Sequence, residues 1–508
     1  MSKDIQAHDP LTRLTPAERK FIHETVSTWS RKKVLDKQKR DLQTAVEIEL
    51  ATIPIYLYTY YSLRRTKDID WNTVSRETRF ANKAGAVIMS VAVEEMLHMS
   101  LSSNIYYSLF AEPPQLYRKS PRKFPTNLHY LGHSRVGPVG PDKKKVVSIP
   151  LAKFSFEQLW HFLQIEYPEP YNTTPVDSDW GTIGQFYSYL RCLLCAPQLT
   201  DADFQVGPVE HQIQSTNYSP NNVDTLSPEK NFNPWKFPDQ AGSAAKVAEY
   251  QNAPDSHAGP AQLLTIDSRL DALEAIDTIC DQGEGFGEKA DADPSGHEKS
   301  HYYKFLKLQS ELTEYKGTTE QLPKIPKQPK PAENPYSAEE LDNVIVNFPD
   351  NPRTKDYRDP DFRALSDFSN GVYEYMLIMT ETLFKVTPAY EQKGFFNQGM
   401  HKSMIWVMDK FIQVMRNLPL SDSAGCHFLA PTFENGALDV SRDKAFGKLC
   451  ELGDEAILAA GRLQLKHPNV EAFQGLESNV RYYVNAALHD MSGGQSMHFP
   501  DVTRYWKH

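Results

Sequence analysis

The chain has 508 residues, 40% of them apolar and 24% charged, so it is long enough for a large buried core. Its net charge of −10, without a long basic block, argues against nucleic acid as a partner. The N-terminus lacks a basic segment followed by an apolar one, and no long uncharged apolar run follows, so we expect a cytoplasmic protein that does not span a membrane. Five cysteines are too few, and odd in number, for a disulfide framework.

The spacing of apolar residues predicts a mainly α-helical chain. The sequence TPAE at Thr15 is typical of a capping box and begins a short first helix. A long second helix is predicted from about 34 to 63, where apolar residues recur at steps of three and four. Glu49 lies on this apolar face, whereas Glu47 lies about 200° around the helix. Of these two carboxylates, only Glu49 is therefore predicted to face the core.

The next predicted helix, from about 80 to 109, carries polar residues where its neighbours are apolar. Its sequence SVAVEEMLHMS places two carboxylates and a histidine in an otherwise apolar run. Glu95 and His98 fall on the apolar stripe, one helical turn apart. Glu94 falls at the edge of the stripe, where it is either a solvated flank residue or a hydrogen-bond partner of the site. We predict Glu95 and Glu94 as the catalytic residues.

Three later segments also place acidic or histidine residues on apolar faces or at helix ends. A capping box, SFEQ, begins a helix whose apolar face ends with Glu166. The run SRLDALEAIDTICDQGEGFG predicts a helix that ends near Glu284, and SHYYKFLKL begins another with His301 on its apolar face. Since the segment between them is rich in glycine and acidic residues, we predict that Glu284 and His301 form a ligand pair split by an insertion. The reserve candidates for that pair are Asp277 and His297.

Segments without helical periodicity divide the rest of the chain. Stretches rich in proline, glycine or polar residues predict insertions at about 115–150, 197–260 and 285–299. The run LPKIPKQPKPAENP predicts an extended linker over 323–335. We therefore predict a helical bundle over 1–322 and a second helical region over 336–508 that packs on it.

The inward-facing residues form a pattern with a specific chemistry. A buried ionised carboxylate is costly unless a proton, a cation or a basic side chain compensates it, and the stripes around these residues carry no lysine or arginine. Glu-x-x-His pairs combined with single glutamates form the site of ferritin-like di-iron and di-manganese bundles. Such a ligand set suits iron, with manganese as the alternative. The predicted metal ligands are Glu49, Glu95, His98, Glu166, Glu284 and His301.

Several motifs of the chain resemble one known family. AVEIELATIPIYLY, SVAVEEMLHMSLSSN, FLQIEYPEP, TIGQFY and DQGEG followed by SHYYKFLKL are similar to the ferritin-like domain of the iminophenyl-pyruvate dimer synthase family. Members in the violacein, rebeccamycin and staurosporine pathways couple two oxidised-tryptophan imines. The resemblance implies a ferritin-like four-helix bundle, with long loop insertions and additional C-terminal helices, that oxidises a small amino-acid-derived or aromatic molecule in natural product biosynthesis.

This sequence departs from the family in two respects. The pathway enzymes are much longer, so this chain resembles a stand-alone ferritin-like unit. The family usually carries a glutamate in the TIGQFY motif, where this chain has Gln185. Some relatives are associated with haem, but this chain has no CxxCH attachment motif, so haem is the less favoured cofactor.

Three functions fit these predictions. The first is a non-haem di-iron oxidoreductase, an oxidase or oxygenase that uses O2 or peroxide to oxidise a small-molecule substrate. The second is ferritin-like metal oxidation or manganese-catalase-like peroxide detoxification without a specific organic substrate. The third is a metal-free helical protein whose buried acids are protonated or hydrogen-bonded to tyrosine hydroxyls. The length and the large insertions favour the first, and a homo-oligomer is compatible with all three.

Overall fold

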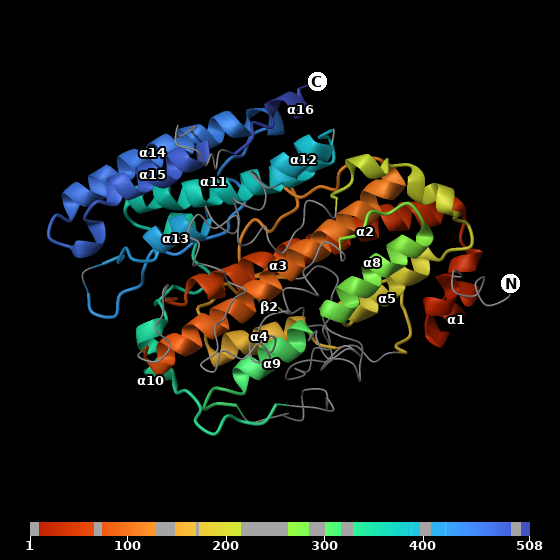
Figure 1. Ribbon diagram of the computed structural model, residues 1–508, viewed down its shortest axis with the longest axis horizontal. Coiled ribbons are helices and arrows are strands. Elements are labelled where there is room, and N and C mark those ends of the chain that lie inside the picture. The colour runs from red at the N-terminus through yellow and green to blue at the C-terminus, as the bar shows by residue number, and fades with distance from the viewer. Residues whose placement is uncertain are drawn as a thin grey trace.

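In the computed structural model of the protein, two long helices, α2 (Arg31–Tyr61) and α3 (Arg76–Phe110), pack along each other at the centre of the molecule (Figure 1). Each begins at a serine N-cap: Ser30 Oγ accepts a hydrogen bond from Lys33 N at 3.2 Å, and Ser75 Oγ accepts one from Thr78 N at 3.3 Å. The structure describes residues 10–65, 74–127, 148–168, 172–214, 263–283, 300–315, 329–387, 389–396, 408–421, 423–488 and 499–507.

The third and fourth helices of the bundle are each made of two pieces. The third consists of α4 (Phe156–Ile165) and α5 (Ile183–Leu194), and the fourth of α8 (Arg269–Gln282) and α9 (His301–Gln309). Near one end of the bundle α4 packs against α9, and near the other α5 packs against α8 (Figure 1). Pro168 explains the first break, because the residue before a proline disfavours helical backbone. The prediction of a mainly α-helical four-helix bundle with insertions is confirmed.

The remaining elements surround this bundle. The predicted capping box is confirmed at Thr15 and Glu18, where helix α1 (Pro16–Glu24) begins and packs against α5. A two-residue strand pair joins β1 (Thr126–Asn127) to β2 (Ser148–Ile149) in antiparallel register. The C-terminal helices are α10 (Ala338–Leu341), α11 (Pro360–Leu383), α12 (Ala389–Phe395), α13 (Asp409–Met415), α14 (Ala445–Lys466), α15 (Leu476–Leu488) and α16 (Thr503–Trp506).

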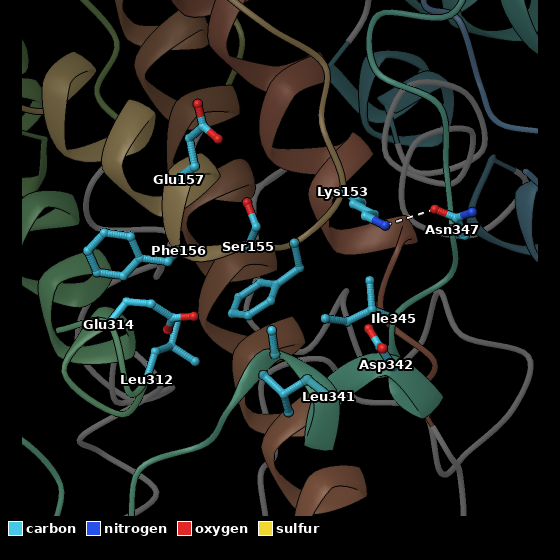
Figure 2. A pocket seen from close by; sticks show the side chains of 12 residues that line it. Lys153, Ser155, Phe156, Glu157, Leu312, Glu314, Leu341, Asp342, Ile345 and Asn347 are labelled. Atoms are coloured by element: carbon cyan, nitrogen blue, oxygen red, sulfur yellow. Dashed lines mark hydrogen bonds between the residues drawn. The ribbon is translucent and has the colours of Figure 1, made fainter. Parts of the chain in front are cut away.

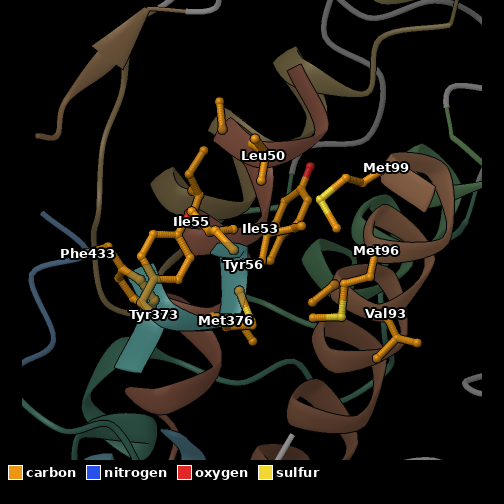
Figure 3. Packing of buried hydrophobic residues seen from close by; sticks show 14 of the residues in the cluster. Leu50, Ile53, Ile55, Tyr56, Val93, Met96, Met99, Tyr373, Met376 and Phe433 are labelled. Carbon is orange, nitrogen blue, oxygen red and sulfur yellow. The ribbon is translucent and has the colours of Figure 1, made fainter. Parts of the chain in front are cut away.

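The C-terminal helices form a second layer that shares its core with the bundle. Helices α11, α14 and α15 pack together beside α2 and α3 (Figure 1). Figure 3 shows Ile53 of α2, Met96 of α3 and Met376 of α11 in one buried cluster. The described part of the Pro-rich segment is hydrogen-bonded to the C-cap of α9, since Ala332 N donates to Ser310 O at 3.0 Å. Residues 316–328, which include the start of the predicted linker, lie outside the described residues.

Most of the predicted insertions also lie outside the described residues, namely 128–147, 215–262 and 284–299. Within the described part of the chain, α3 is the one helix that is long and apolar enough to cross a membrane. Its most apolar window is entirely buried inside the protein, as in the core helix of a bundle.

A buried carboxylate fastens the C-terminal layer to the loop after α3. Glu381 of α11 accepts hydrogen bonds from Leu116 N at 2.7 Å and Tyr117 N at 3.0 Å, and it pairs with Arg442. We expect Glu381→Ala to lower the free energy of unfolding by about 2 to 4 kcal/mol, because it leaves two buried main-chain amides without an acceptor and the partly buried Arg442 without its partner. Urea denaturation measures the change.

The matched control is Glu451→Ala, which removes the solvent-exposed pair of Glu451 with Lys448 at 3.0 Å. A surface pair of this kind contributes at most about 1 kcal/mol. Equal losses in the two variants would contradict the role assigned to Glu381.

Candidate metal centre

Five acidic and histidine side chains from four helices meet in the middle of the bundle. Each is at most 3% exposed, and they are Glu49 of α2, Glu95 and His98 of α3, Glu166 at the end of α4 and His301 at the start of α9. The breaks in the third and fourth helices lie at this level, so Glu166 and His301 are presented by helix ends. Glu284, the sixth predicted ligand, lies outside the described residues.

These side chains form two groups of three that share one carboxylate. In the first, ligand atoms of Glu49, Glu95 and His98 all lie within 4.8 Å of one another. In the second, the same is true of Glu95, Glu166 and His301. Glu95 therefore stands between two adjacent positions, each of which has two carboxylates and one imidazole.

His301 turns one ring nitrogen toward the carboxylates and the other away from them. Its Nδ1 lies 2.9 Å from Glu95 Oε1 and 3.5 Å from Glu166 Oε2, yet it makes no hydrogen bond to either. Its Nε2 lies 2.8 Å from Glu94 Oε2, which also accepts a hydrogen bond from Lys304 Nζ at 2.5 Å. Since a carboxylate bound by a lysine is an acceptor, Nε2 carries the proton and donates to Glu94.

His98 has the same orientation in the other group. Its Nδ1 lies 3.7 Å from Glu49 Oε2, and its Nε2 lies 3.0 Å from Gln282 Oε1 at the end of α8. Because an amide oxygen can only accept, Nε2 is again the protonated nitrogen. The rings of His98 and His301 stack at 23° with their centroids 5.4 Å apart. Both imidazoles thus present Nδ1 to the space between the carboxylates.

Hydroxyl groups hold the remaining carboxylate oxygens. The hydroxyl of Tyr187 donates to Glu49 Oε1, and that of Tyr56 donates to Glu166 Oε1. The Thr52 hydroxyl lies 2.9 Å from Glu95 Oε2 and 2.9 Å from the main-chain oxygen of Glu49. All three glutamates are therefore fixed by a hydroxyl as well as by their helix.

The crowding of acids changes how these groups hold protons. Burial, together with the charges of Glu49 and Glu166, raises the pKa of Glu95 well above its ordinary value. Burial alone would lower the pKa of His301, but the charge of Glu166 and the contacts with Glu94 and Glu95 outweigh it and raise that pKa well above its ordinary value. Without a cation, the site therefore keeps protons that separate, solvated side chains would lose near neutral pH.

The pKa values of Glu49 and Glu94 shift in the opposite direction. Burial raises the pKa of Glu49, but hydrogen bonds with His98 and Glu95 outweigh burial, so the net pKa lies below its ordinary value. Burial likewise opposes ionisation of Glu94, and the charge of Lys304 together with the His301 contact lowers the pKa of Glu94 to about 2. Glu94 is consequently an ionised, fully buried residue.

A protein-family model described as ferritin-like matches residues 42–310, more than half of the chain. The chain belongs to the ferritin-like family. Among solved structures, the crystal structure of a ferritin-like protein from Caulobacter vibrioides is similar at 19% identity and a TM-score of 0.39, covering 75% of this chain and 97% of that chain. No curated protein matches the chain.

Ferritin-like bundles hold two metal ions between glutamates and histidines, and the residues of this chain fit such a pair. The orphaned Nδ1 of buried His301 points toward two carboxylates and has the position of a ligand nitrogen. Carboxylate oxygens with imidazole nitrogen suit iron or manganese, and the donor atoms include no thiolate that would favour a softer metal. Each histidine also has the outer hydrogen bond that fixes a metal-binding tautomer.

The outer residues of the ferritin-like site were only partly predictable. Glu94 is not a solvated flank residue, because it is buried and its carboxylate lies against Nε2 of His301. Its prediction as a catalytic residue stays a prediction. Asp277 lies elsewhere, paired with Arg13 at 3.1 Å, and Gln185 accepts a hydrogen bond from Gly181 N at 2.7 Å. His297, the other reserve candidate, lies outside the described residues.

Sequence reasoning missed the partners of the two histidines. The apolar stripes offered no base to pair a buried acid, yet Lys304 of α9 pairs with Glu94 of α3. The signal was the spacing of His301 and Lys304, which lie one turn apart on one helix face. Gln282 gave no signal, because an uncharged amide near a helix end is common on protein surfaces.

A separate pocket lies away from the ferritin-like site. Figure 2 shows it beside the N-terminal end of α4, with Phe156, Leu312 and Leu341 among its lining residues and a volume of about 640 Å³. Glu166 follows Phe156 by a whole helix of roughly 15 Å. No member of the two carboxylate and histidine groups lines this pocket.

The protons held at the site predict how metal-free protein responds to pH. A group whose pKa is raised in the folded state stabilises the folded protein at pH values below its ordinary pKa. This stabilisation is lost as the pH rises toward and through the folded-state pKa. For Glu95 and His301 this loss lies above their ordinary values of 4.5 and 6.5, whereas the lowered values of Glu49 and Glu94 act below 4.5. We expect the melting temperature of metal-free protein to fall between about pH 5 and 8, with each group contributing up to about 1.4 kcal/mol per pH unit.

Other groups also titrate in this range, so the measurement is the difference between wild type and Glu95→Gln. This variant keeps the shape of the side chain and removes its ionisation, so the fall should become shallower. Saturating Mn(II) should remove most of the fall in wild type, because a bound cation replaces the protons. Parallel pH profiles for the two metal-free proteins would contradict the assignment.

Proposed function

We propose that this protein is a non-haem di-iron oxidoreductase that uses O2 or peroxide to oxidise a small amino-acid-derived or aromatic substrate. The observation that supports it most is the sharing of Glu95 by two carboxylate and histidine groups, each with an inward Nδ1. A single metal would need one such group, and a structural acid cluster would need neither imidazole oriented in this way. Residues Glu49, Glu95, His98, Glu166 and His301 would hold the two ions, and the role of Glu284 as a further ligand stays part of the proposal.

Iron bound at these residues supplies redox chemistry with O2 or peroxide, which protein side chains alone do not provide. The chain's own contribution begins with Glu95, which reaches both groups from the middle of the site. When Glu95 is protonated, it can donate a hydrogen bond to Thr52 Oγ1. The Thr52 hydroxyl then donates its own hydrogen to the main-chain oxygen of Glu49. When Glu95 is ionised, Thr52 can donate back to it. Glu95 therefore changes its protonation without leaving a buried polar atom unpaired.

The two tyrosines keep the terminal glutamates in place and keep water away from them. Tyr56 packs against Phe162 at 4.8 Å and Phe305 at 5.3 Å, measured between ring centroids, while its hydroxyl donates to Glu166. Burial and the charge of Glu166 raise the pKa of Tyr56 well above its ordinary value, so it remains a neutral donor. The dry surroundings strengthen the attraction of these carboxylates for a cation.

The metal content is the first test. We expect purified protein reconstituted with Fe(II) to hold about two equivalents of iron. Because Glu95 serves both positions, Glu95→Ala should lose most of both equivalents rather than one. Elemental analysis, with oxygen uptake by the reduced protein, measures the two effects.

The matched control is Glu47→Ala on the opposite face of α2, where Glu47 pairs with Lys119 at 3.2 Å and belongs to neither group. It should keep wild-type iron content and oxygen uptake. A folded wild-type protein that takes up no iron or manganese would overturn the proposal.

A second experiment separates an enzyme from a metal-storage or peroxide-detoxifying protein. An oxidoreductase with an organic substrate consumes O2 in proportion to substrate over many turnovers, whereas iron storage consumes it in proportion to the Fe(II) added. We expect turnover with amino-acid-derived imines or related aromatic compounds, detected by mass spectrometry. Oxygen uptake that follows added iron alone, or peroxide disproportionation without a substrate, would instead assign the alternative function.

A further inference from the structure

We infer that the two metal positions differ in affinity, and that the position at His301 is the tighter one because Glu94 and Lys304 act on it as positioning residues. This inference rests on the proposed di-metal function and adds a property of the same site. The two groups of three side chains that share Glu95 form the two halves of the site. The inference rests on one difference between these halves, namely the group that accepts a hydrogen bond from each histidine.

The inner parts of the two halves match closely. Among the described residues, each half has one terminal glutamate, Glu49 or Glu166, and both halves use Glu95. Each terminal glutamate accepts a hydrogen bond from one buried tyrosine hydroxyl. Each histidine faces the carboxylates through Nδ1. These inner residues therefore give no reason for one position to bind metal much more strongly than the other.

The outer parts differ in kind. His98 Nε2 donates to Gln282 Oε1 at 3.0 Å, which is a neutral acceptor. His301 Nε2 donates to Glu94 Oε2 at 2.8 Å, which is an ionised acceptor buried in the same core. A hydrogen bond to a charged acceptor is about twice as strong as one between neutral groups. It draws the proton from the imidazole and makes Nδ1 the better electron-pair donor of the two.

Lys304 makes a buried charge at Glu94 possible. Its Nζ lies 2.5 Å from the same oxygen that accepts from His301, and its side chain is 6% exposed. The pair has no net charge, so the two histidines are backed by groups of equal total charge. The expected difference in affinity thus arises from the local hydrogen bond and not from extra negative charge around the site.

A metal titration of the wild-type protein cannot by itself show that the two positions differ. Two nearby dications repel each other and bind stepwise even in a symmetric site. We therefore isolate the positions with His98→Ala, which leaves the His301 position, and His301→Ala, which leaves the His98 position. Mn(II) is the probe, with free Mn(II) followed by electron paramagnetic resonance and heats by titration calorimetry at one fixed pH. Each variant should bind about one equivalent, and His98→Ala should bind it about 10- to 100-fold more tightly.

The decisive variant replaces the charged pair by neutral groups. In the His98→Ala background, Glu94→Gln with Lys304→Met removes both charges together, so no buried ion is left unpaired. Its Mn(II) affinity should fall to within about threefold of that of His301→Ala, because its histidine is then backed by an amide as His98 is. Circular dichroism checks that each variant is folded. If an alanine variant unfolds, His98→Asn or His301→Asn takes its place.

The outcomes separate this inference from the proposed function. Two equivalents of Mn(II) in wild type, with equal affinities in the two single-position variants or tighter binding at His98, would overturn the inference and leave the di-metal function standing. An unchanged first-equivalent affinity when Glu94→Gln and Lys304→Met are introduced into the full site would overturn it as well. Absence of any Mn(II) or Fe(II) binding in folded wild type would overturn both.

Discussion

Three carboxylates buried around one point are the constraint on which the rest of this structure depends. Glu49, Glu95 and Glu166 are buried beside two imidazoles, with the ligand atoms of each group of three within 4.8 Å of one another. Burial and repulsion from Glu49 and Glu166 raise the pKa of Glu95, while attraction to Glu166 raises that of His301 against the effect of burial. Each of the three carboxylates also lies within hydrogen-bond distance of a hydroxyl. Two bound dications would compensate the repulsion between the carboxylates. The arrangement that destabilises the metal-free protein therefore favours metal binding.

The geometry of the bundle follows from this constraint. Helices α2 and α3 run uninterrupted past the site, while the third and fourth helices each end there. A break in a helix leaves main-chain amides without hydrogen-bond partners. N-cap residues supply some of these partners, as Ser300 does when its Oγ accepts a hydrogen bond from Tyr303 N at 3.3 Å. The main-chain amide of His301 also donates to Gly283 O at 2.9 Å, which ties the end of α8 to the start of α9. Helix continuity is lost where the ligands are needed, and local hydrogen bonds offset the cost.

The sequence predicted the inward residues better than their partners. Periodicity alone placed Glu49, Glu95 and Glu166 on apolar faces, because a stripe of three- and four-residue steps leaves little freedom in where a side chain points. It could not predict that Lys304 meets Glu94, since that contact depends on how two helices far apart in sequence are rotated about their axes. The same holds for Tyr187 and Gln282, which look like ordinary core and surface residues until the bundle is assembled.

The helices beyond the family match also contribute to the site's rigidity. The ferritin-like match ends at residue 310, yet the buried core continues from Ile53 and Met96 into α11 without a boundary (Figure 3). Tyr58 donates to the main-chain oxygen of Pro349, and Arg65 pairs with Asp409 of α13 at 2.6 Å, so α2 is held from outside on the turns that follow Tyr56. A ligand helix that is anchored at its far end keeps its glutamate in one place. The C-terminal layer thus helps to hold the three acids and two histidines of the candidate metal centre in place.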